Sequence, residues 1–480
     1  TDIFGHLCNY FKPFMLIQKK DKQQAVYILC ILNTSQIYGD CLLSFYFECG
    51  INVYVTKKGE LIHMVKSVAA PQAKGKSAED KIFGANNRAV ALTEKLGADK
   101  VINGTVGSLL DEDGNLVMLD VVQKAYKALT PKEIVAYAPI QGYPDYLEAA
   151  IDQCFGESRP DGYIRACATS GGSGVLHHVI HNYSEWGDDI LTSDWHWGAY
   201  GSMCHDNGRN LREFNLLTDD GKFNFQSFKE HVSAMVAKQY NTVIIMNSPA
   251  NNPTGFGLSD SDWDQVLSFL KDVVKGQDKN IIFVSDVAYL DYSGEKHECR
   301  KFFKKFGNMP DNVFIIVAYT CSKGFTMYGQ RMGAMIGITQ NKDIADEFVA
   351  INQYTSRATW SNSNSAAMKV MANICKDPAK VAELDAERAK YFHLIQERAD
   401  LFMKEADECG LKYLRYISGF FITIPLIGAQ KVCDELEKEN IFLVPLEKGI
   451  RLAVCSVSKK KIHGLAAKIK ATFDAVGVQQ

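Results

Sequence analysis

Lys323 is the side chain in this sequence that is best placed for covalent chemistry. It follows the apolar run VFIIVAY (313–319), which predicts a buried strand, and the small hydroxyl residues Thr320 and Ser322. A buried lysine at the end of a strand can lose its proton and attack an aldehyde, forming a Schiff base. Arg331 follows eight positions later and offers a fixed positive charge. This arrangement favours pyridoxal 5'-phosphate as a cofactor.

A carboxylate must face the pyridine nitrogen of that cofactor to keep its ring protonated. Asp286 follows the apolar run IIFV (281–284), and Tyr289 comes three residues later. In open α/β sheets, ligands bind at the carboxyl ends of the strands. We therefore expect Asp286 to pair with the ring nitrogen and Tyr289 to bond the ring oxygen. An aspartate after a strand can also be a helix cap or a turn residue.

The segment TVIIMNSPANNPTG (242–255) reads as another strand that ends in a polar turn. Asn252 in this turn is a candidate donor to the same ring oxygen. It lies thirty-four residues before Asp286 and seventy-one before Lys323, a spacing that suits neighbouring strand ends.

The run TSGGSGVLHHVI (169–180) passes from a strand-like segment through glycines into a helical pattern. Backbone amides at a helix start bind phosphate, which makes Gly172, Ser173 and Gly174 candidates for a cradle. No Lys-Ser/Thr pair closes the run, so it is not a Walker motif. Trp197 follows the strand-like DDILTS and can stack on a pyridine ring, although an ordinary half-buried tryptophan is the alternative.

Together these motifs resemble the aspartate and aromatic branch of the class I, fold-type I aminotransferases, from about Gly84 to the C-terminus. The resemblance includes the turn Val106-Gly107 before an acidic stretch, and the run YAPIQGYPDYLEA (137–149). It implies an α/β fold-type I PLP-dependent transferase. Such a fold has a large domain with a mostly parallel sheet and a smaller α/β domain.

The resemblance also implies roles for individual residues. Lys323, Asp286 and Tyr289 would be catalytic. The cofactor would further contact Gly172, Ser173, Trp197, Asn252, Thr320, Ser322, Arg331 and, from a neighbouring subunit, Tyr137.

Substrate recognition follows from the same resemblance, with Gly107 in the substrate site. Arg451 in GIRLAVCSVS (449–458) would clamp the substrate α-carboxylate with two parallel N–H donors. Arg357 in SRATWSNSN (356–364) would reach across a dimer interface to a distal carboxylate. A surface arginine is the alternative for that position.

The sequence departs from the family pattern at three positions. Ala199 and Tyr200 follow Trp197-Gly198 where aspartate-specific members usually carry Asn and His. That His supports the pyridine-binding carboxylate, and Tyr200 is a candidate substitute. Ala358 replaces the proline after the cross-subunit arginine. These changes weaken an expectation of strict aspartate specificity and leave the expected cofactor site intact.

The composition of the 480-residue chain indicates a soluble globular protein. It has 46% apolar and 23% charged residues, and its net charge of −3 implies no polyanion partner. No apolar run reaches the roughly 20 residues of a membrane span. Thirteen cysteines without a metal-binding spacing favour free thiols in a reducing, cytoplasmic compartment. His177 and His181 lie one helical turn apart without a zinc-protease glutamate, so we expect no metal site.

We expect four regions along the chain. Residues 1–63 form an extension of unknown role, with Met64 as the expected natural start. Residues 64–115 form an N-terminal arm and part of the small domain, and residues 116–390 form the large PLP-binding domain. Residues 391–480 complete the small domain, and a long amphipathic helix over 376–409 connects the two.

The predicted function is a ping-pong transfer of an amino group to a 2-oxo acid such as 2-oxoglutarate. The donor is aspartate, glutamate or an aromatic amino acid, and the sequence does not choose among them. A homodimer with shared active sites follows from the roles of Tyr137 and Arg357. A PLP-dependent lyase or decarboxylase of the same fold, or a silent PLP-binding paralogue, are the alternatives.

Overall fold

The computed structural model describes residues 43–46, 51–55, 61–66, 68–73, 76 and 81–478. The chain divides into two compact units, Thr1–Ala78 and Glu79–Gln480. The first unit holds an antiparallel sheet of β1 (Leu43–Tyr46), β2 (Ile51–Val55) and β3 (Leu61–Lys66), in that order. β3 crosses the predicted boundary at residue 63, and β1 and β2 lie within the predicted extension. The other residues of that extension lie outside the described residues. None of the helices in the described ranges is long and apolar enough to cross a membrane.

The second unit is built on a seven-stranded sheet with the order β5-β11-β10-β9-β8-β6-β7. β11 runs antiparallel to both of its neighbours, and the other strands pair in parallel. Every residue of β10 and β11 is buried, as expected for strands covered on both faces. The strands are β5 (Tyr163–Ser170), β6 (Asp189–Ser193), β7 (Asn210–Phe214), β8 (Asn241–Asn247), β9 (Asn280–Asp286), β10 (Val313–Thr320) and β11 (Met332–Thr339).

The register of the central strands brings their carboxyl ends to one edge of the sheet. Asn247 at the end of β8 pairs with Asp286 at the end of β9, and Asp286 pairs with Ala318 of β10. This confirms the mostly parallel α/β sheet expected between residues 163 and 337. The three polar strand ends predicted from the sequence therefore lie side by side.

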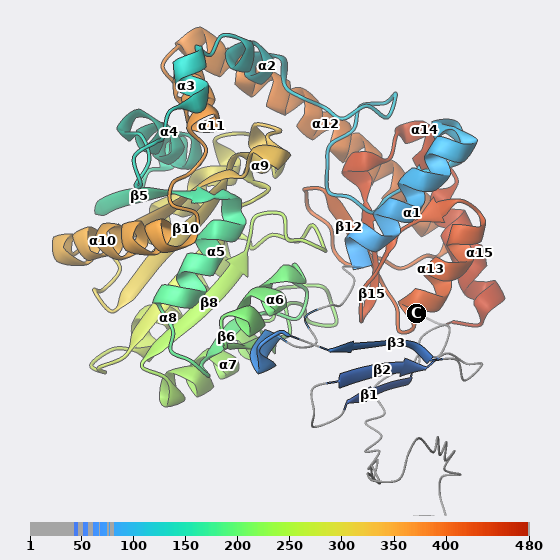
Figure 1. Ribbon diagram of the computed structural model, residues 1–480, viewed down its shortest axis with the longest axis horizontal. Coiled ribbons are helices and arrows are strands. Elements are labelled where there is room, and N and C mark those ends of the chain that lie inside the picture. The colour runs from blue at the N-terminus through green and yellow to red at the C-terminus, as the bar shows by residue number, and fades with distance from the viewer. Residues whose placement is uncertain are drawn as a thin grey trace, which may run out of the picture. The chain divides into compact units, whose positions relative to one another are not determined.

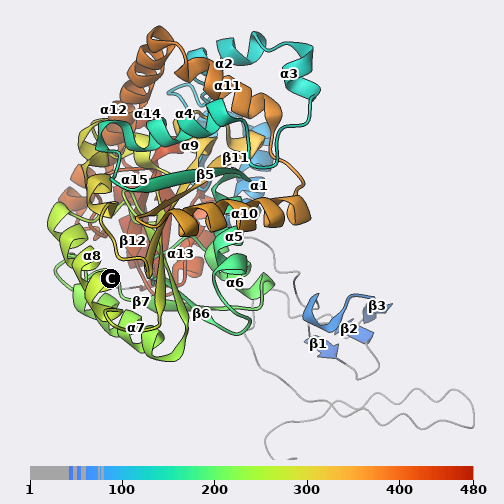
Figure 2. The same ribbon diagram turned by 90° about the vertical axis from the view of Figure 1, so that its left-hand side faces the viewer.

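Helices cover both faces of this sheet. The residues of α5, α6 and α10 form one core with inward residues such as Cys167 and Met335, whereas α4, α7, α8 and α11 belong to the core on the other face. α4 and α10 lie on opposite sides of β5 in Figure 2. Their bounds are α4 (Pro144–Phe155), α5 (Gly171–Asn182), α6 (Ala199–Asp206), α7 (Phe225–Lys238), α8 (Asp260–Val273), α10 (Lys342–Thr359) and α11 (Ser365–Cys375).

A smaller α/β layer contains a three-stranded antiparallel sheet with the order β12-β15-β14 and a parallel pair of β4 and β13. The pairing of β4 with β13 joins segments more than three hundred residues apart in the sequence. Its elements are α1 (Lys81–Leu96), β4 (Ile102–Asn103), β12 (Phe421–Pro425), α13 (Ala429–Lys438), β13 (Ile441–Phe442), β14 (Val444–Pro445), β15 (Gly449–Ala453), α14 (Lys459–Ile462) and α15 (Leu465–Val476).

The long helix α12 (Pro378–Cys409) runs from the large sheet region to this smaller layer (Figure 1). Its start has the expected signals, because the Asp377 side chain accepts from the Ala379 N–H and Pro378 occupies the first turn. Gly410 ends it in a left-handed conformation with φ of 71°. The helix expected over 376–409 is therefore present, and the domain boundaries at 115 and 390 stay predictions. The remaining α-helices of the described residues are α2 (Asp120–Lys127), α3 (Pro131–Val135) and α9 (Cys321–Gly324).

Candidate active site

A cavity of about 560 Å³ opens at the carboxyl ends of β8, β9 and β10 and extends to β12 and β15. It brings together twelve of the predicted site residues. They are Gly107, Gly172, Ser173, Trp197, Asn252, Asp286, Tyr289, Thr320, Ser322, Lys323, Arg331 and Arg451.

Lys323 lies on the one-turn helix α9, directly after β10. Its Nζ donates to the Gly107 carbonyl oxygen at 3.0 Å and lies 4.8 Å from the centre of the Tyr328 ring. Burial lowers the pKa of the ammonium group to about 8, and the positive charges of Arg331 and Arg451 act in the same direction. A lysine with this pKa has a substantial neutral, nucleophilic fraction near neutral pH.

Asp286 is buried at the end of β9, and its carboxylate accepts a hydrogen bond from a side chain of α6. The Tyr200 hydroxyl donates to Asp286 Oδ2 at 2.6 Å, and the Ala288 N–H donates to Oδ1 at 3.1 Å. Burial raises the pKa of the Asp286 carboxyl group, and these two bonds oppose that rise. Tyr200 therefore contacts the predicted pyridine partner from the position where the family pattern has His.

Asn252, Tyr289 and Arg451 form a continuous polar chain along one wall. Asn252 Nδ2 donates to the Tyr289 hydroxyl at 3.3 Å, and Arg451 Nη1 donates to Asn252 Oδ1 at 3.1 Å. Arg451 Nη2 also donates to the Thr105 carbonyl oxygen at 2.7 Å, and the guanidinium lies 4.3 Å from the centre of the Phe421 ring. These bonds hold both Nη atoms of the buried Arg451 guanidinium at the cavity.

The predicted phosphate cradle lies where β5 passes into α5. Gly171 has φ of 67°, and a Cβ there would come within 2.7 Å of Arg331 Nη2. Arg331 Nη1 approaches Ser322 Oγ at 3.4 Å, and the Thr320 hydroxyl donates to the same Oγ at 3.0 Å. The first amides of a helix have no partners within the helix, so this corner combines free donors with a cation. Gly174 does not line the cavity, and a Cβ there would instead lie 3.0 Å from the Trp360 ring.

Trp197 and Gly107 both line the cavity. The Trp197 ring makes an edge contact with the Tyr200 ring, with centroids 5.8 Å apart. A Cβ at Gly107 would lie 2.6 Å from Phe421 Cζ, so any larger residue in this loop would have to displace the Phe421 ring.

Besides Gly174, two further predicted residues do not line the cavity. Tyr137 follows α3 with 89% of its surface exposed, and Arg357 is exposed near the end of α10 with its Nη1 on Ser361 Oγ. Their expected roles were assigned to a neighbouring subunit, and a single chain does not test them.

Sequence reasoning missed Asn247 and Tyr328 among the cavity residues. Asn247 Nδ2 donates to the Asp286 carbonyl oxygen at 2.9 Å, and its Oδ1 accepts from the Asn252 N–H at 2.7 Å, so it ties two site loops together. The signal was an asparagine at the end of an apolar strand, TVIIMN. Tyr328 lies within the lysine motif itself, and its hydroxyl accepts from the Leu109 N–H at 3.0 Å.

His177 and His181 lie on α5 with stacked rings whose centroids are 5.9 Å apart. Over the part of the chain that the structure describes, no group of three or more His, Cys, Asp or Glu side chains is placed to hold a metal ion.

Comparison with known proteins identifies the family. The family model for aminotransferase class I and II matches residues 99–469. The chain belongs to this aminotransferase family. The tyrosine aminotransferase of Klebsiella pneumoniae is 24% identical over 382 residues, which cover 77% of this chain and 92% of that protein.

Solved structures agree with this assignment. An aminotransferase from Anaerococcus prevotii is 38% identical, with a TM-score of 0.82 over 85% of this chain and 99% of its own. An aromatic-amino-acid aminotransferase from Burkholderia pseudomallei, covalently bound to pyridoxal phosphate, shares the fold at 22% identity, with a TM-score of 0.69 over 84% of this chain and 100% of its own.

The protein is thus a PLP-dependent transaminase that moves an amino group between an amino acid and a 2-oxo acid. The cavity fits pyridoxal phosphate on its own chemistry. It combines a buried lysine of lowered pKa, a buried carboxylate, and a corner that glycine keeps open beside Arg331. The expected family, fold, activity and cofactor are confirmed.

Proposed function

We propose that Lys323 both binds the cofactor and moves the proton in this transaminase. The observation that carries this proposal is a neutralisable amine in a cavity that also holds Asp286 and the Arg451 fork. Bound pyridoxal phosphate would supply an aldehyde carbon and an electron-withdrawing ring. With substrate bound, the Lys323 amine would take the proton from the substrate α-carbon. A base with a pKa near neutrality suits this step.

Asp286 would hold the pyridine nitrogen in its protonated form, and Asn252 and Tyr289 would donate to the ring oxygen. Their support is the existing polar chain, since Asn252 already donates to the Tyr289 hydroxyl. Tyr200 would keep the Asp286 carboxyl ionised by donating to it. Trp197 would stack on the pyridine ring, and its place in the cavity wall supports that role.

The phosphate would bind the amides of Gly172 and Ser173, the hydroxyls of Thr320 and Ser322, and Arg331. The start of a twelve-residue helix, α5, together with a guanidinium gives that corner a positive potential.

Arg451 would clamp the substrate α-carboxylate, with Gly107 next to it. The guanidinium is held at both ends by Asn252 and Thr105, which fixes its fork before substrate arrives and so lowers the cost of ordering. The proposed donors are aspartate, glutamate and aromatic amino acids, with 2-oxoglutarate as acceptor. Apolar residues of the cavity wall, including Phe83, Leu176 and Phe421, support the acceptance of aromatic side chains.

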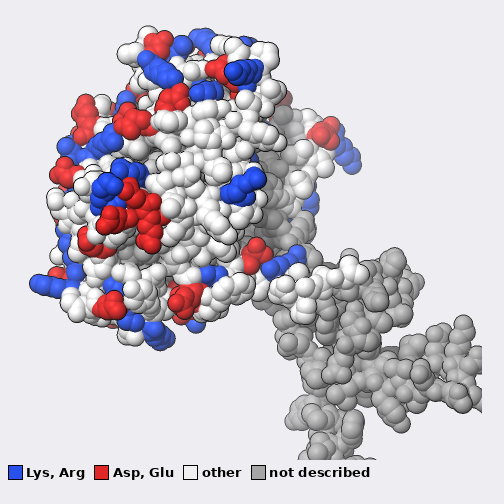
Figure 3. Space-filling model, turned by 60° about the vertical axis from the view of Figure 1, so that its left-hand side comes forward, with Lys and Arg blue, Asp and Glu red and all other residues white. Residues whose placement is uncertain are grey.

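A homodimer with shared active sites completes the proposal. Tyr137 would reach the partner's phosphate site and Arg357 the partner's substrate. The support is a broad area nearly free of charged side chains in Figure 3, together with exposed apolar residues at α3 and α10, namely Ile134, Val135 and Tyr354. Uncharged exposed faces with aromatic residues are typical of subunit interfaces.

We also propose a cytoplasmic location. The nine cysteines within residues 81–478 are free thiols, which suits a reducing compartment.

Subunit complementation tests the shared site. Lys323→Ala and Arg357→Ala would each have little activity with aspartate and 2-oxoglutarate. In a mixed dimer, one site has both mutations and the other has an intact lysine and an intact arginine. Random mixing makes half of the dimers mixed, so activity should recover to about a quarter of the wild-type value. Mixing without recovery would reject the cross-subunit role of Arg357.

A further inference from the structure

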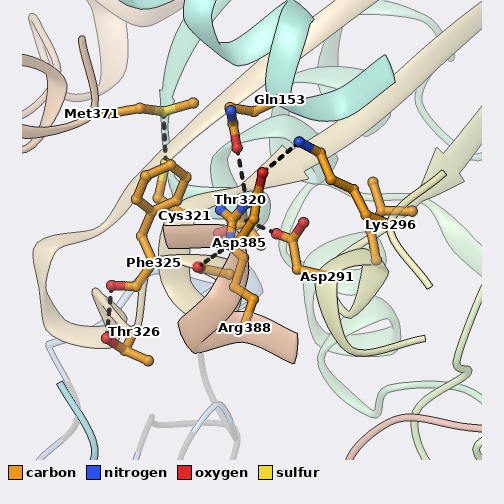
Figure 4. A network of polar contacts seen from close by, with 12 residues as sticks. Gln153, Asp291, Lys296, Thr320, Cys321, Phe325, Thr326, Met371, Asp385 and Arg388 are labelled. Carbon is orange, nitrogen blue, oxygen red and sulfur yellow. Dashed lines mark hydrogen bonds and ion pairs between the residues drawn. The ribbon is translucent and has the colours of Figure 1, made fainter. Parts of the chain in front are cut away.

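A buried ion-pair network lies directly behind the helix turn that carries Lys323. Asp291 accepts from Arg300 Nη2 and lies 3.5 Å from Arg388 Nη2, and none of the three side chains is more than 7% exposed (Figure 4). Burial opposes the ionisation of Asp291, yet the guanidinium groups of Arg388 and Arg300 hold the pKa of this carboxyl below its usual value. The network is therefore charged in the interior.

Arg388 connects this network to the lysine turn through two contacts. Its Nε donates to the Gly324 carbonyl oxygen at 2.7 Å, and its guanidinium lies 4.6 Å from the centre of the Phe325 ring. Gly324 and Phe325 are the two residues that follow Lys323. Because α12 carries Arg388, this side chain attaches the long connecting helix to α9.

Asp291 of the same ion-pair network also approaches Gly324 closely. A Cβ at residue 324 would lie 1.8 Å from Asp291 Oδ2, so this position has space for glycine alone. The second Arg388 nitrogen, Nη1, donates to Gln153 Oε1 on α4 at 2.8 Å, which fixes the guanidinium plane. The carbonyl after Lys323 is thus held by a side chain that is itself held from two sides.

Stability alone is a weak explanation for these charges. Buried ion pairs lose much of their attraction to desolvation, and apolar residues of similar volume are often as stable. A directed contact to one backbone carbonyl, by contrast, fixes the position of the adjacent residue. Errors of about 1 Å in a reacting group can reduce a rate by about a hundredfold.

We propose that Arg388 is a positioning residue for Lys323. It holds the Gly324 carbonyl and the Phe325 ring so that the lysine amine stays at its place in the cavity, with Asp291 and Gln153 orienting the guanidinium. This inference rests on the proposed role of Lys323 as the cofactor-binding amine.

The test uses two variants and a matched control in the full chain. Arg388→Lys keeps the charge beside Asp291 and removes the directed bond to Gly324. Gln153→Met leaves Arg388 in place and removes one of its two anchors. Arg398→Lys is the control, because Arg398 is also fully buried on α12 but binds Glu112 and the carbonyls of Leu110 and Cys455.

Two measurements report on the position of the lysine rather than on stability. The first is the pH dependence of the labelling of Lys323 by pyridoxal, which lacks the phosphate, in the cofactor-free protein. The adduct is trapped with borohydride and quantified by mass spectrometry. The other is the separation of kcat from KM in the holoenzyme. We expect Arg388→Lys to shift the labelling midpoint by at least about half a pH unit and to lower kcat about tenfold with little change in KM.

Gln153→Met should change the labelling midpoint and kcat in the same direction as Arg388→Lys, but by less. Arg398→Lys should lower the melting temperature without changing the labelling midpoint or kcat. If Arg388→Lys does not fold, Gln153→Met decides the outcome. Unchanged labelling and kcat in the folded variants, or equal effects in Arg398→Lys, would overturn the proposal. A wild-type protein in which pyridoxal phosphate does not label Lys323 would instead reject the proposed function.

Discussion

The Tyr200 hydroxyl donates to Asp286 Oδ2 at 2.6 Å, across eighty-six residues of sequence. Both side chains are buried, Tyr200 completely. A tyrosine donates one hydrogen bond and stays neutral, whereas the His of the family pattern can become cationic. The carboxylate at the end of β9 therefore relies on hydrogen bonds, and not on a neighbouring positive charge, to oppose the effect of burial on its pKa.

Tyr200→Phe should weaken cofactor binding. The pKa of the Asp286 carboxyl is already raised by burial, and loss of the Tyr200 donor would raise it further and leave less of it ionised. Hydrogen bonds to charged groups contribute roughly 1.5–3 kcal/mol, so the dissociation constant of pyridoxal phosphate should rise about tenfold or more. Tyr146→Phe is the control, since Tyr146 is also fully buried and donates to the Gly333 carbonyl, and neither of these residues lines the cavity. Equal cofactor affinities in both variants would contradict this role.

Lys323 should make the stability of the cofactor-free protein depend on pH in the alkaline range. Its folded-state pKa is lowered to about 8 from 10.5, so the unfolded chain binds more protons between these two values. Stability should therefore rise with pH from about 8 to about 10.5, by up to about 3 kcal/mol from this group.

Urea unfolding of the wild type and of Lys323→Met, at about pH 7 and about pH 10, measures that contribution. The variant should be the more stable protein at the lower pH. Its advantage should shrink as pH rises, because removing the proton from the wild-type lysine on folding then costs less free energy. A difference that is constant over this range would show that the buried amine has an ordinary pKa.

Arg451→Lys should reduce substrate binding more than turnover. A lysine cannot present two parallel N–H donors to a carboxylate, and it would lose the paired contacts with Asn252 and Thr105. We expect kcat/KM to fall about a hundredfold, mainly through KM. Arg209→Lys is a control, because Arg209 is also buried and bonded to Ser184 and Asn207 elsewhere in the fold. If the Arg451→Lys variant keeps the wild-type KM for aspartate and phenylalanine, Arg451 does not bind the substrate.

Gly171→Ala should damage the phosphate corner specifically. The new Cβ would lie 2.7 Å from Arg331 Nη2 at a residue with φ of 67°. Gly187→Ala is a matched control, since Gly187 has φ of 88° and no heavy atom within 4 Å of the place that a new methyl group would take. Both changes should cost about 1 kcal/mol of stability through the left-handed backbone. Weakened phosphate and cofactor binding should appear only in Gly171→Ala, and equal binding by the two variants would contradict the assignment.

The strand ends of this site are predictable because local patterns encode them. The apolar runs before Asp286, Asn252 and Lys323 each predict a buried strand, and parallel strands bring their carboxyl ends to one edge. The register of Asn247, Asp286 and Ala318 is the physical result. Motifs and their spacing thus predicted the cofactor and several of the cavity residues, whereas Gly107 and Arg451 were predicted from the family resemblance.

Contacts between distant elements were not predictable in the same way. The approach of Arg388 to Gly324 depends on how α12 packs against α2, α11 and the segment Leu290–Tyr292, and no spacing in the sequence encodes that. The bond from Tyr200 to Asp286 was anticipated only as a substitution for a family residue. Tyr137 and Arg357 lie outside the cavity of one chain, and the roles proposed for them require a second copy.

The central claim is tested most directly by the absorbance spectrum of the purified protein with pyridoxal phosphate. The spectrum is recorded before and after single amino acids are added without an acceptor. The wild type should show the visible band of a lysine-bound cofactor, and glutamate, aspartate or phenylalanine should convert it to the pyridoxamine form. Lys323→Ala should show no such band. A band in Lys323→Ala equal to that of the wild type, or a wild-type band that no amino acid discharges, would contradict the proposed role of Lys323.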